Sequence, residues 1–479
     1  MLSKLKNINI NLIIKILFAL SCTMFVLPAI LYLIRNRTVF IFDKWFLFLL
    51  NNSNRHMQTF LYIIILAMMT ILYSVIIKRQ KEMFENIKQV LIYVTIIASI
   101  FLISISFTCS DIFYYLGIGR LSSEYNQNPY YVTIEDFVEG YDSKEELQKD
   151  TVLMQGYLND WADTTVVYGP IWTSICKFIA SLSLGNIDLG IFLFRILNII
   201  IHILNCYVFY KISNKKIFSV LYGLNPYMLI EGIMCVHNDI FVVCFILLAL
   251  YFLIKKKKLA ISVVFIALAT AIKYFAILLL PLFIIYHFRK EKPLYRFGKC
   301  VQYGLLFAIV LLIPYLLYIK DFEVFAGIFT MQTRFAKNFY IIIEQYFQPA
   351  GLKEIVNKFL LIIFVYIYFC ASLILLIKPK IKFNVEAKKL QYFLIAFLFL
   401  LITNFQPWYI MWLFPLLIWQ KSKNIKLMIQ ISLISQFANS IFLAYTESWI
   451  NGTPFTLCMI LGTIICTCLN NRKKKRMKT

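Results

Sequence analysis

The chain has 479 residues, of which 61% are hydrophobic, 17% aromatic and only 15% charged, and its 48 Lys and Arg residues outnumber 24 Asp and Glu. Soluble globular domains are about half apolar and about a quarter charged, so this composition excludes an ordinary soluble protein and indicates a polytopic membrane protein. In such a chain the basic excess is first a topology signal, and we expect no nucleic-acid partner. The 11 cysteines form no CxxC pair, which predicts reduced thiols and not a disulfide or metal framework.

Seven apolar runs without a charged residue qualify as membrane-spanning helices, which need about 20 such residues. They cover residues 16–34, 58–77, 89–110, 300–319, 359–377, 427–446 and 448–471. The first run is too long for a signal peptide and has no small-residue cleavage site, so we expect it to remain as an anchor.

The basic residues indicate the topology. Of the 48, 32 fall in eight clusters, at residues 4–6, 78–88, 211–216, 255–258, 289–299, 378–389, 421–426 and 472–478. Short loops rich in Lys and Arg stay cytoplasmic. We therefore expect an even number of crossings between neighbouring clusters and both termini in the cytoplasm.

Two intervals between clusters are too short for a pair of full-length helices. Residues 259–288 are interrupted by Lys273 and Pro281, and residues 390–420 by Asn404, Gln406 and Pro407. We predict paired short helices in both intervals. Broken helices are tolerated in a membrane only where the break faces protein or a wet cavity, so the breaks indicate a site. Counting them as crossings predicts an all-α protein with about 12 to 14 transmembrane helices.

Residues 109–167 form the one large polar segment, with 11 acids against three basic residues. Topology predicts that this acidic loop, which follows the third helix, is external. Within it, residues 135–149 have the pattern of one exposed amphipathic helix, and the apolar stretch that ends at Leu184 predicts a re-entrant element above a cavity. The expected domains are N-terminal transmembrane helices (1–108), an outer loop with a re-entrant segment (109–187) and C-terminal transmembrane helices (188–479).

Asp111 directly follows the apolar residues of the third predicted span, at the level of the lipid headgroups. It is either an interfacial acid beside an aromatic belt or a catalytic base that faces a membrane-bound substrate. An external transferase has no nucleotide sugar available, and a polyprenyl-phosphate sugar fits as the donor. Displacing phosphate from a sugar needs one carboxylate to deprotonate the acceptor, with inversion, and cations to hold the departing phosphate.

Two cations at membrane depth are candidates for binding that phosphate. Lys273 lies at the break of a predicted short-helix pair, and Arg195 lies near the outer start of a span. Charges inside a membrane are functional candidates by default, although Arg195 has the alternative of reaching the outer headgroups. We add Arg120 of the outer segment to this set.

Two polar clusters complete the candidate site. His237-Asn238-Asp239 falls at the external end between two spans, where it forms either a hydrogen-bonded cluster or ordinary loop polarity. Gln406-Pro407-Trp408-Tyr409 marks the second break, where Gln406, Trp408 and Tyr409 either contact a sugar or belong to an interfacial belt.

The order of these motifs resembles that in the C-type (GT-C) integral-membrane glycosyltransferases. The motifs are the acid that closes a span, Tyr168-Gly169-Pro170, His237-Asn238-Asp239, Lys273 with Pro281, and Gln406-Pro407-Trp408-Tyr409. Bacterial polyprenyl-phosphate-mannose-dependent mannosyltransferases and glycosylphosphatidylinositol mannosyltransferases are the most similar, over roughly residues 90–420.

The resemblance implies transfer of a sugar, most simply mannose, from a polyprenyl-phosphate donor to a cell-envelope glycan or lipid acceptor at the outer face of the cell membrane, a reaction of cell-envelope biogenesis. It implies that Asp111 takes the position of the family's loop acid, and that donor or acceptor contacts lie around His237, Asn238, Asp239 and Lys273. Our full set of expected sugar- or acceptor-binding residues is Tyr114, Tyr168, His237, Asn238, Asp239, Gln406, Trp408 and Tyr409. Many relatives carry a paired acid motif, whereas Phe113 occupies the second place here, so a divalent metal is left open. The sequence alone leaves two other functions open, a lipid-linked glycan flippase or transporter and an O-antigen-ligase-like enzyme.

Overall fold

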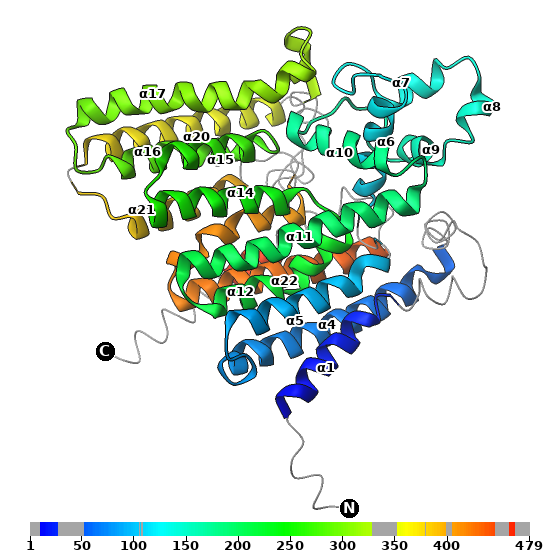
Figure 1. Ribbon diagram of the computed structural model, residues 1–479, viewed down its shortest axis with the longest axis horizontal. Helices are drawn as coiled ribbons and strands as arrows, with labels where there is room; N and C mark the ends of the chain where they lie inside the picture. The colour runs from blue at the N-terminus through cyan, green and yellow to red at the C-terminus, as the bar shows by residue number, and fades with distance from the viewer. Residues whose placement is uncertain are drawn as a thin grey trace, which may run out of the picture.

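The computed structural model describes residues 10–26, 52–104, 106, 109–327, 352–378, 380–398, 405–445 and 459–464. Over these residues every regular element is a helix and there is no strand (Figure 1). The predicted all-α class is therefore confirmed. The predicted span at 448–471 falls largely outside the described residues, and the span at 16–34 is described only as far as residue 26. The predicted division into three domains stays a prediction.

The N-terminal helices pack with the last long helix. They are α1 (Ile10–Thr23), α4 (Asn52–Met83) and α5 (Ile87–Ile100), followed by the short turn η2 (Phe101–Ile103). Helix α1 contacts α4 and α5, and α22 (Ser422–Tyr445) contacts α4. The side chain of Asn86 accepts a hydrogen bond from the backbone of Gln89, a cap that explains why α5 begins there.

The acidic segment folds into short helices at one end of the molecule. These are α6 (Asp111–Ser123), α7 (Ile134–Glu139), α8 (Lys144–Leu147), α9 (Thr151–Tyr157) and α10 (Pro170–Leu182). The single helix predicted over 135–149 is wrong, because Thr133 caps α7 and the chain leaves the helix at Gly140. Helix α10 packs on α6 and, with 13 residues, is too short to span a bilayer core of roughly 30 Å.

The central helices contain the first of the two expected breaks. They are α11 (Ile187–Ser213), α12 (Lys216–Gly223), α13 (Pro226–Leu229), η3 (Ile230–Met234), α14 (Asp239–Tyr251), η4 (Phe252–Lys256), α15 (Leu259–Thr270), η5 (Tyr274–Leu279) and α16 (Leu280–His287). Lys273 lies in extended backbone between α15 and η5. The break predicted in residues 259–288 is confirmed at this lysine.

The remaining helices are α17 (Pro293–Leu312), η6 (Ile313–Leu317), η7 (Phe322–Phe325), α20 (Leu352–Ile377), α21 (Phe383–Ala396) and η9 (Pro407–Trp419). Helix α21 ends at Ala396 and η9 begins at Pro407, so the second interval is also divided into two short helices. Asn404, predicted at this break, lies outside the described residues.

Four described helices are long and apolar enough to cross a membrane: Thr59–Met83, Ile187–Ser213, Pro293–Leu317 and Phe359–Ile377. The pair Lys216–Gly223 and Pro226–Met234, bent by 58°, makes a fifth if it is one span. The chain is therefore a multi-pass membrane protein. The predicted total of about 12 to 14 helices stays a prediction.

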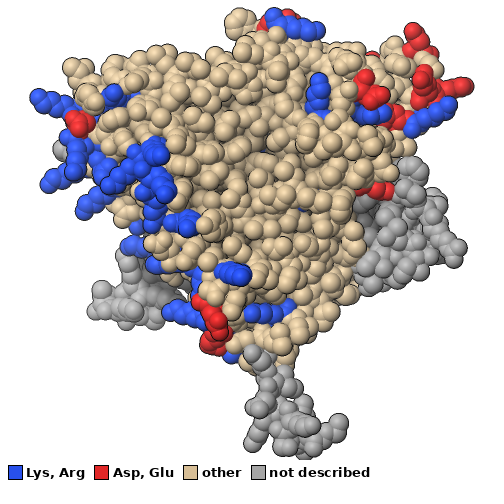
Figure 2. Space-filling model, viewed as in Figure 1, with Lys and Arg blue, Asp and Glu red and all other residues tan. Residues whose placement is uncertain are grey.

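Charge is divided between the two ends of the helices. Figure 2 shows Lys and Arg gathered where α16, α17, α20 and α21 turn, and acidic side chains over α7 and α8 at the opposite end. This distribution agrees with the expected topology, since basic loops stay cytoplasmic.

Candidate active site

Asp111 is the first residue of α6 and lines a small cavity of about 40 Å³. The other lining residues are Tyr114, Trp161, Thr164, Val167, Tyr168, Gln406, Trp408 and Tyr409. The Asp111 side chain is buried, and the hydroxyl of Tyr115 lies 3.5 Å from its Oδ2. The carboxylate thus faces a pocket of aromatic and amide groups, and neither bulk water nor lipid.

A larger cavity of about 240 Å³ lies between α16, α20 and α21. Most of its lining is aliphatic or aromatic, and its charged members are Lys378, Glu386 and Lys389. Glu386 is ion-paired with both lysines. We assign the functional site to the smaller cavity because it combines a buried carboxylate with aromatic and amide side chains.

The Tyr168-Gly169-Pro170 turn is hydrogen-bonded to the backbone just before Lys273, where the helix is broken. The backbone N–H of Gly169 donates to the carbonyl of Ile272 at 3.1 Å, and that of Ile171 to the carbonyl of Ala271 at 3.2 Å. A Cβ atom at position 169 would lie 2.1 Å from the Ala271 oxygen, so only glycine allows this approach. The motif therefore places the Tyr168 ring beside Lys273.

Lys273 is paired with Asp239, the first residue of α14. Its Nζ donates to both carboxylate oxygens at 2.8 Å, and Trp412 Nε1 donates to the same carboxylate. The ammonium also lies 4.5 Å from the centre of the Tyr409 ring and 5.9 Å from that of Tyr168, within the range of cation–π attraction. Both rings line the Asp111 pocket, so the expected cation lies against two residues of the cavity that contains the expected base.

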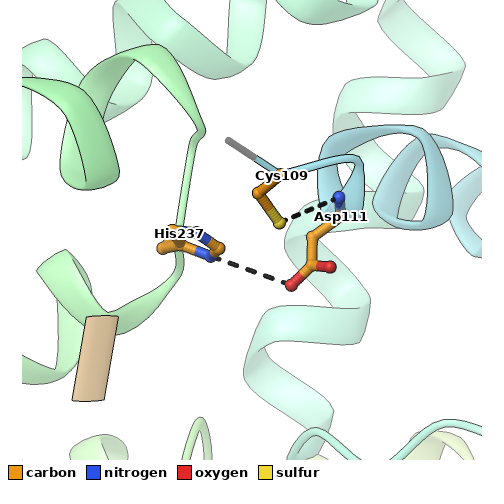
Figure 3. A group of neighbouring side chains, drawn as sticks. All are labelled: Cys109, Asp111 and His237. Carbon is orange, nitrogen blue, oxygen red and sulfur yellow. Dashed lines mark hydrogen bonds and ion pairs between the residues drawn. The ribbon is translucent and has the colours of Figure 1, made fainter. Parts of the chain in front are cut away.

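His237 lies between two buried carboxylates. Its Nε2 is 3.0 Å from Oε2 of Glu231, and its Nδ1 is 3.8 Å from Oδ2 of Asp111 (Figure 3). The imidazole stacks on Trp408 with ring centres 3.9 Å apart. Val236, just before it, has φ +60°, an unusual conformation for a β-branched residue. The backbone is strained where it aims His237 at Asp111.

Asn238 is also fully buried, and its side-chain oxygen and nitrogen have no hydrogen-bond partner among the described residues. Buried amides nearly always have partners. An amide in this state, between His237 and Asp239 in the sequence, is a candidate to bind a hydroxyl-rich ligand.

The structure does not bring Arg195 to the pocket. Its guanidinium is fully buried and donates to the carbonyls of Leu102, Ser104 and Met234 and to the hydroxyl of Ser106. These acceptors lie in the two backbone segments that lead to Asp111 and His237. Arg195 therefore holds the segments together, and the prediction that it binds phosphate is not supported by its position.

Arg120 is likewise distant from the pocket. It pairs with Asp150 at 2.7 Å and with Glu124 at 3.0 Å. Nine residues of helix separate it from Asp111, which amounts to roughly 13 Å along α6. Its partners explain its place in the outer segment without a phosphate.

Two residues in contact with the site were absent from the predicted set. Glu231 is an acid within a long apolar stretch, six residues before His237, and that isolation was a usable signal. Trp412 stacks on Tyr409 at 4.5 Å. The two are three residues apart in a 3₁₀ helix, where such residues eclipse, and sequence offered no sign that η9 is 3₁₀.

In this helical membrane protein a buried acid and aromatic rings line one pocket, and a paired lysine lies against two of those rings. This is the arrangement expected of an integral-membrane glycosyltransferase. Residues 21–289 match the family model described as "Alpha-(1->6)-mannopyranosyltransferase, N-terminal domain". The match covers more than half of the chain, so the protein belongs to this GT-C mannosyltransferase family. Searches of curated proteins and of solved structures gave no match.

Proposed function

We propose that the protein transfers mannose from a polyprenyl-phosphate donor to a cell-envelope glycan or lipid acceptor at the outer membrane face. The family supports mannose as the sugar. The observation that carries the proposal is one pocket shared by a buried carboxylate, Asp111, and by aromatic rings that contact Lys273.

In the proposed reaction Asp111 accepts the proton of the acceptor hydroxyl. The hydroxyl oxygen forms a bond to the anomeric carbon while the bond from that carbon to the phosphate oxygen breaks. The phosphate leaves with the electron pair and its polyprenyl chain, and the configuration inverts. One carboxylate suffices because phosphate leaves as a stable anion without protonation, unlike the alkoxide of a glycoside.

Lys273 is the residue that we assign to the departing phosphate. The Lys273 side chain is 11% exposed, and its ammonium is paired with Asp239. A phosphate that approaches Tyr409 and Tyr168 would share the ammonium with Asp239, and charge-assisted hydrogen bonds of this kind are the strong ones. His237, Asn238, Gln406 and the rings of Trp408 and Tyr409 are then proposed to bind the sugar and acceptor.

The proposed membrane side follows from charge. Asp111 begins the segment that carries 11 of the 24 acids, and the basic residues gather at the other end of the helices (Figure 2). We propose that both termini are cytoplasmic and that the pocket opens outward.

Cysteine labelling in intact cells tests this orientation. Ser143 and Lys256 are both exposed, and the described native cysteines are buried or only partly exposed. We expect an impermeant maleimide to label Ser143→Cys but not Lys256→Cys. Labelling of Lys256→Cys alone would reverse the topology.

The donor is tested with purified protein in liposomes and three radiolabelled substrates. We expect transfer from polyprenyl-phosphate mannose, and none from GDP-mannose or from a polyprenyl-pyrophosphate glycan. Use of the pyrophosphate would indicate an O-antigen-ligase-like enzyme. Movement of the lipid across the bilayer without release of polyprenyl phosphate would indicate a flippase.

A further inference from the structure

Five side chains with metal-binding atoms gather on the side of Asp111 that faces His237. Two overlapping groups, Cys109 with Asp111 and His237, and Glu231 with Cys235 and His237, each place one donor atom per residue within 4.8 Å of the others. None of the five is more than 6% exposed. A buried set of sulfur, nitrogen and oxygen donors is an uncommon feature in the interior of a membrane protein.

The charges of this cluster are not balanced by the described side chains. Asp111 and Glu231 are buried carboxylates, and His237 is the only basic side chain within ion-pair distance of either in the part of the chain that the structure describes. Lys273 is engaged with Asp239. Burying two carboxylates beside one imidazole is costly, and a bound cation would supply the missing positive charge.

The orientation of His237 favours one of the two groups. Its Nε2 lies 3.0 Å from Glu231 and its Nδ1 is directed at Asp111, and neither ring nitrogen has a hydrogen-bond partner among the described residues. Metal-bound histidines commonly present their second nitrogen to a carboxylate in this way. Nε2 thus faces the Glu231 carboxylate, and Nδ1 faces Asp111 in the group that also contains Cys109.

The distances also suit an ion between Asp111 and His237. The 3.8 Å from Nδ1 to Oδ2 is too long for a hydrogen bond. Ligands about 2.0 to 2.2 Å from a tetrahedral zinc lie roughly 3.3 to 3.6 Å apart. A shift of a few tenths of an ångström would bring both atoms into coordination.

Cys109 supplies the third donor. Figure 3 shows its sulfur beside the N-terminus of α6, where it accepts the backbone N–H of Asp111 at 3.3 Å. Cysteine binds metals as the thiolate, so zinc binding at Cys109 would release its proton. A site with sulfur, nitrogen and oxygen ligands suits zinc better than the oxygen-preferring magnesium or calcium.

We propose that Cys109 Sγ, Asp111 Oδ2 and His237 Nδ1 bind a zinc ion, with Glu231 holding the imidazole. Three protein ligands leave a fourth position open, as in catalytic zinc sites, and one of the three, Asp111, also lines the pocket. Zinc binding stands independently of the proposed function. Its role there, to bind an oxygen of the departing lipid phosphate, rests on that function, and the second oxygen of Asp111 stays available to accept a proton.

The test is zinc content and cobalt absorption of the full-length protein, purified in detergent without chelator. After dialysis against zinc chloride, elemental analysis should find close to one zinc per chain. Exchange with cobalt chloride should give the near-ultraviolet absorption of a thiolate–cobalt bond. Cys109→Ser should lose both signals. Cys176→Ser, which changes an equally buried cysteine in α10, should keep both.

Further variants separate loss of a ligand from loss of the fold. His237→Gln should bind no zinc while it elutes as a single species, and Glu231→Gln should weaken zinc binding by roughly 10- to 100-fold. A wild-type protein without zinc, or a Cys109→Ser protein with full zinc and the same cobalt spectrum, would overturn the site. Active but zinc-free wild-type enzyme would leave the proposed transfer reaction intact, whereas zinc-loaded enzyme without transferase activity would contradict the reaction alone.

Discussion

Lys273 and Arg195 are both cations buried in the helical bundle, yet their surroundings differ. Arg195 is surrounded by backbone carbonyls and one hydroxyl, and its donors are used within the fold. Lys273 is held by one carboxylate and faces aromatic rings of the pocket. The comparison teaches that burial marks a cation as costly, while the partners decide whether it supports the backbone or is available to a ligand.

Arg195→Met should have the largest effect on stability. It would remove the guanidinium donor to the carbonyls of Leu102 and Ser104, each loss costing about 1 to 3 kcal/mol, so we expect destabilisation on the order of 4 kcal/mol. Thermal unfolding in detergent measures it. Arg79→Met, which removes an exposed pair with Glu82, is the control and should change stability little. A stable Arg195→Met protein that no longer binds donor would show that Arg195 does bind the phosphate.

Replacing Lys273 should weaken donor binding more than it destabilises the fold, provided that the charge of its partner Asp239 is removed in the same protein. In Lys273→Met alone, Asp239 is left as a buried unpaired charge, so the informative protein is Lys273→Met with Asp239→Asn, compared with Asp239→Asn alone. We expect polyprenyl-phosphate affinity to fall by roughly 10- to 100-fold, the value of a charge-assisted contact. Equal affinity in a titration of the two proteins would remove Lys273 from the site.

Tyr409→Leu should have the smallest effect of the three. It removes the ring 4.5 Å from Lys273 Nζ, an interaction worth about 0.5 to 2 kcal/mol. We expect a several-fold rise in KM for the donor with little change in stability. Tyr366→Leu, on the exposed face of α20, serves as the control. The same rise in both variants would indicate a general effect of removing an aromatic ring.

The sequence predicted the helical class, the break at Lys273 and the short helices near Pro407, because hydrocarbon restricts the backbone to few solutions. It also identified Asp111, Tyr168, Gln406, Trp408 and Tyr409, which line one pocket in the structure. Their catalytic and binding roles stay predictions.

Other features depend on tertiary structure that no local pattern shows. Arg195 has the same sequence signature as a phosphate-binding residue. Only its contacts with Leu102, Ser104 and Met234 in the structure show how its donors are used. Cys109 belongs to a group of metal-binding atoms only because Asp111 and His237 lie beside it. These two residues are 126 positions apart in the sequence and meet only in the folded chain. The helix predicted over 135–149 was wrong because capping and a glycine outweigh its amphipathic pattern.

The most direct test of the proposed mechanism is mannose transfer by purified Asp111→Asn, compared with Asp142→Asn in the exposed part of the outer segment. Loss of a general base lowers rates by about 10²- to 10⁴-fold. We therefore expect Asp111→Asn to lose transfer by this factor while it inserts and folds normally, and Asp142→Asn to stay active. Transfer by folded Asp111→Asn within a few-fold of the wild-type rate would contradict the role of Asp111 as the base.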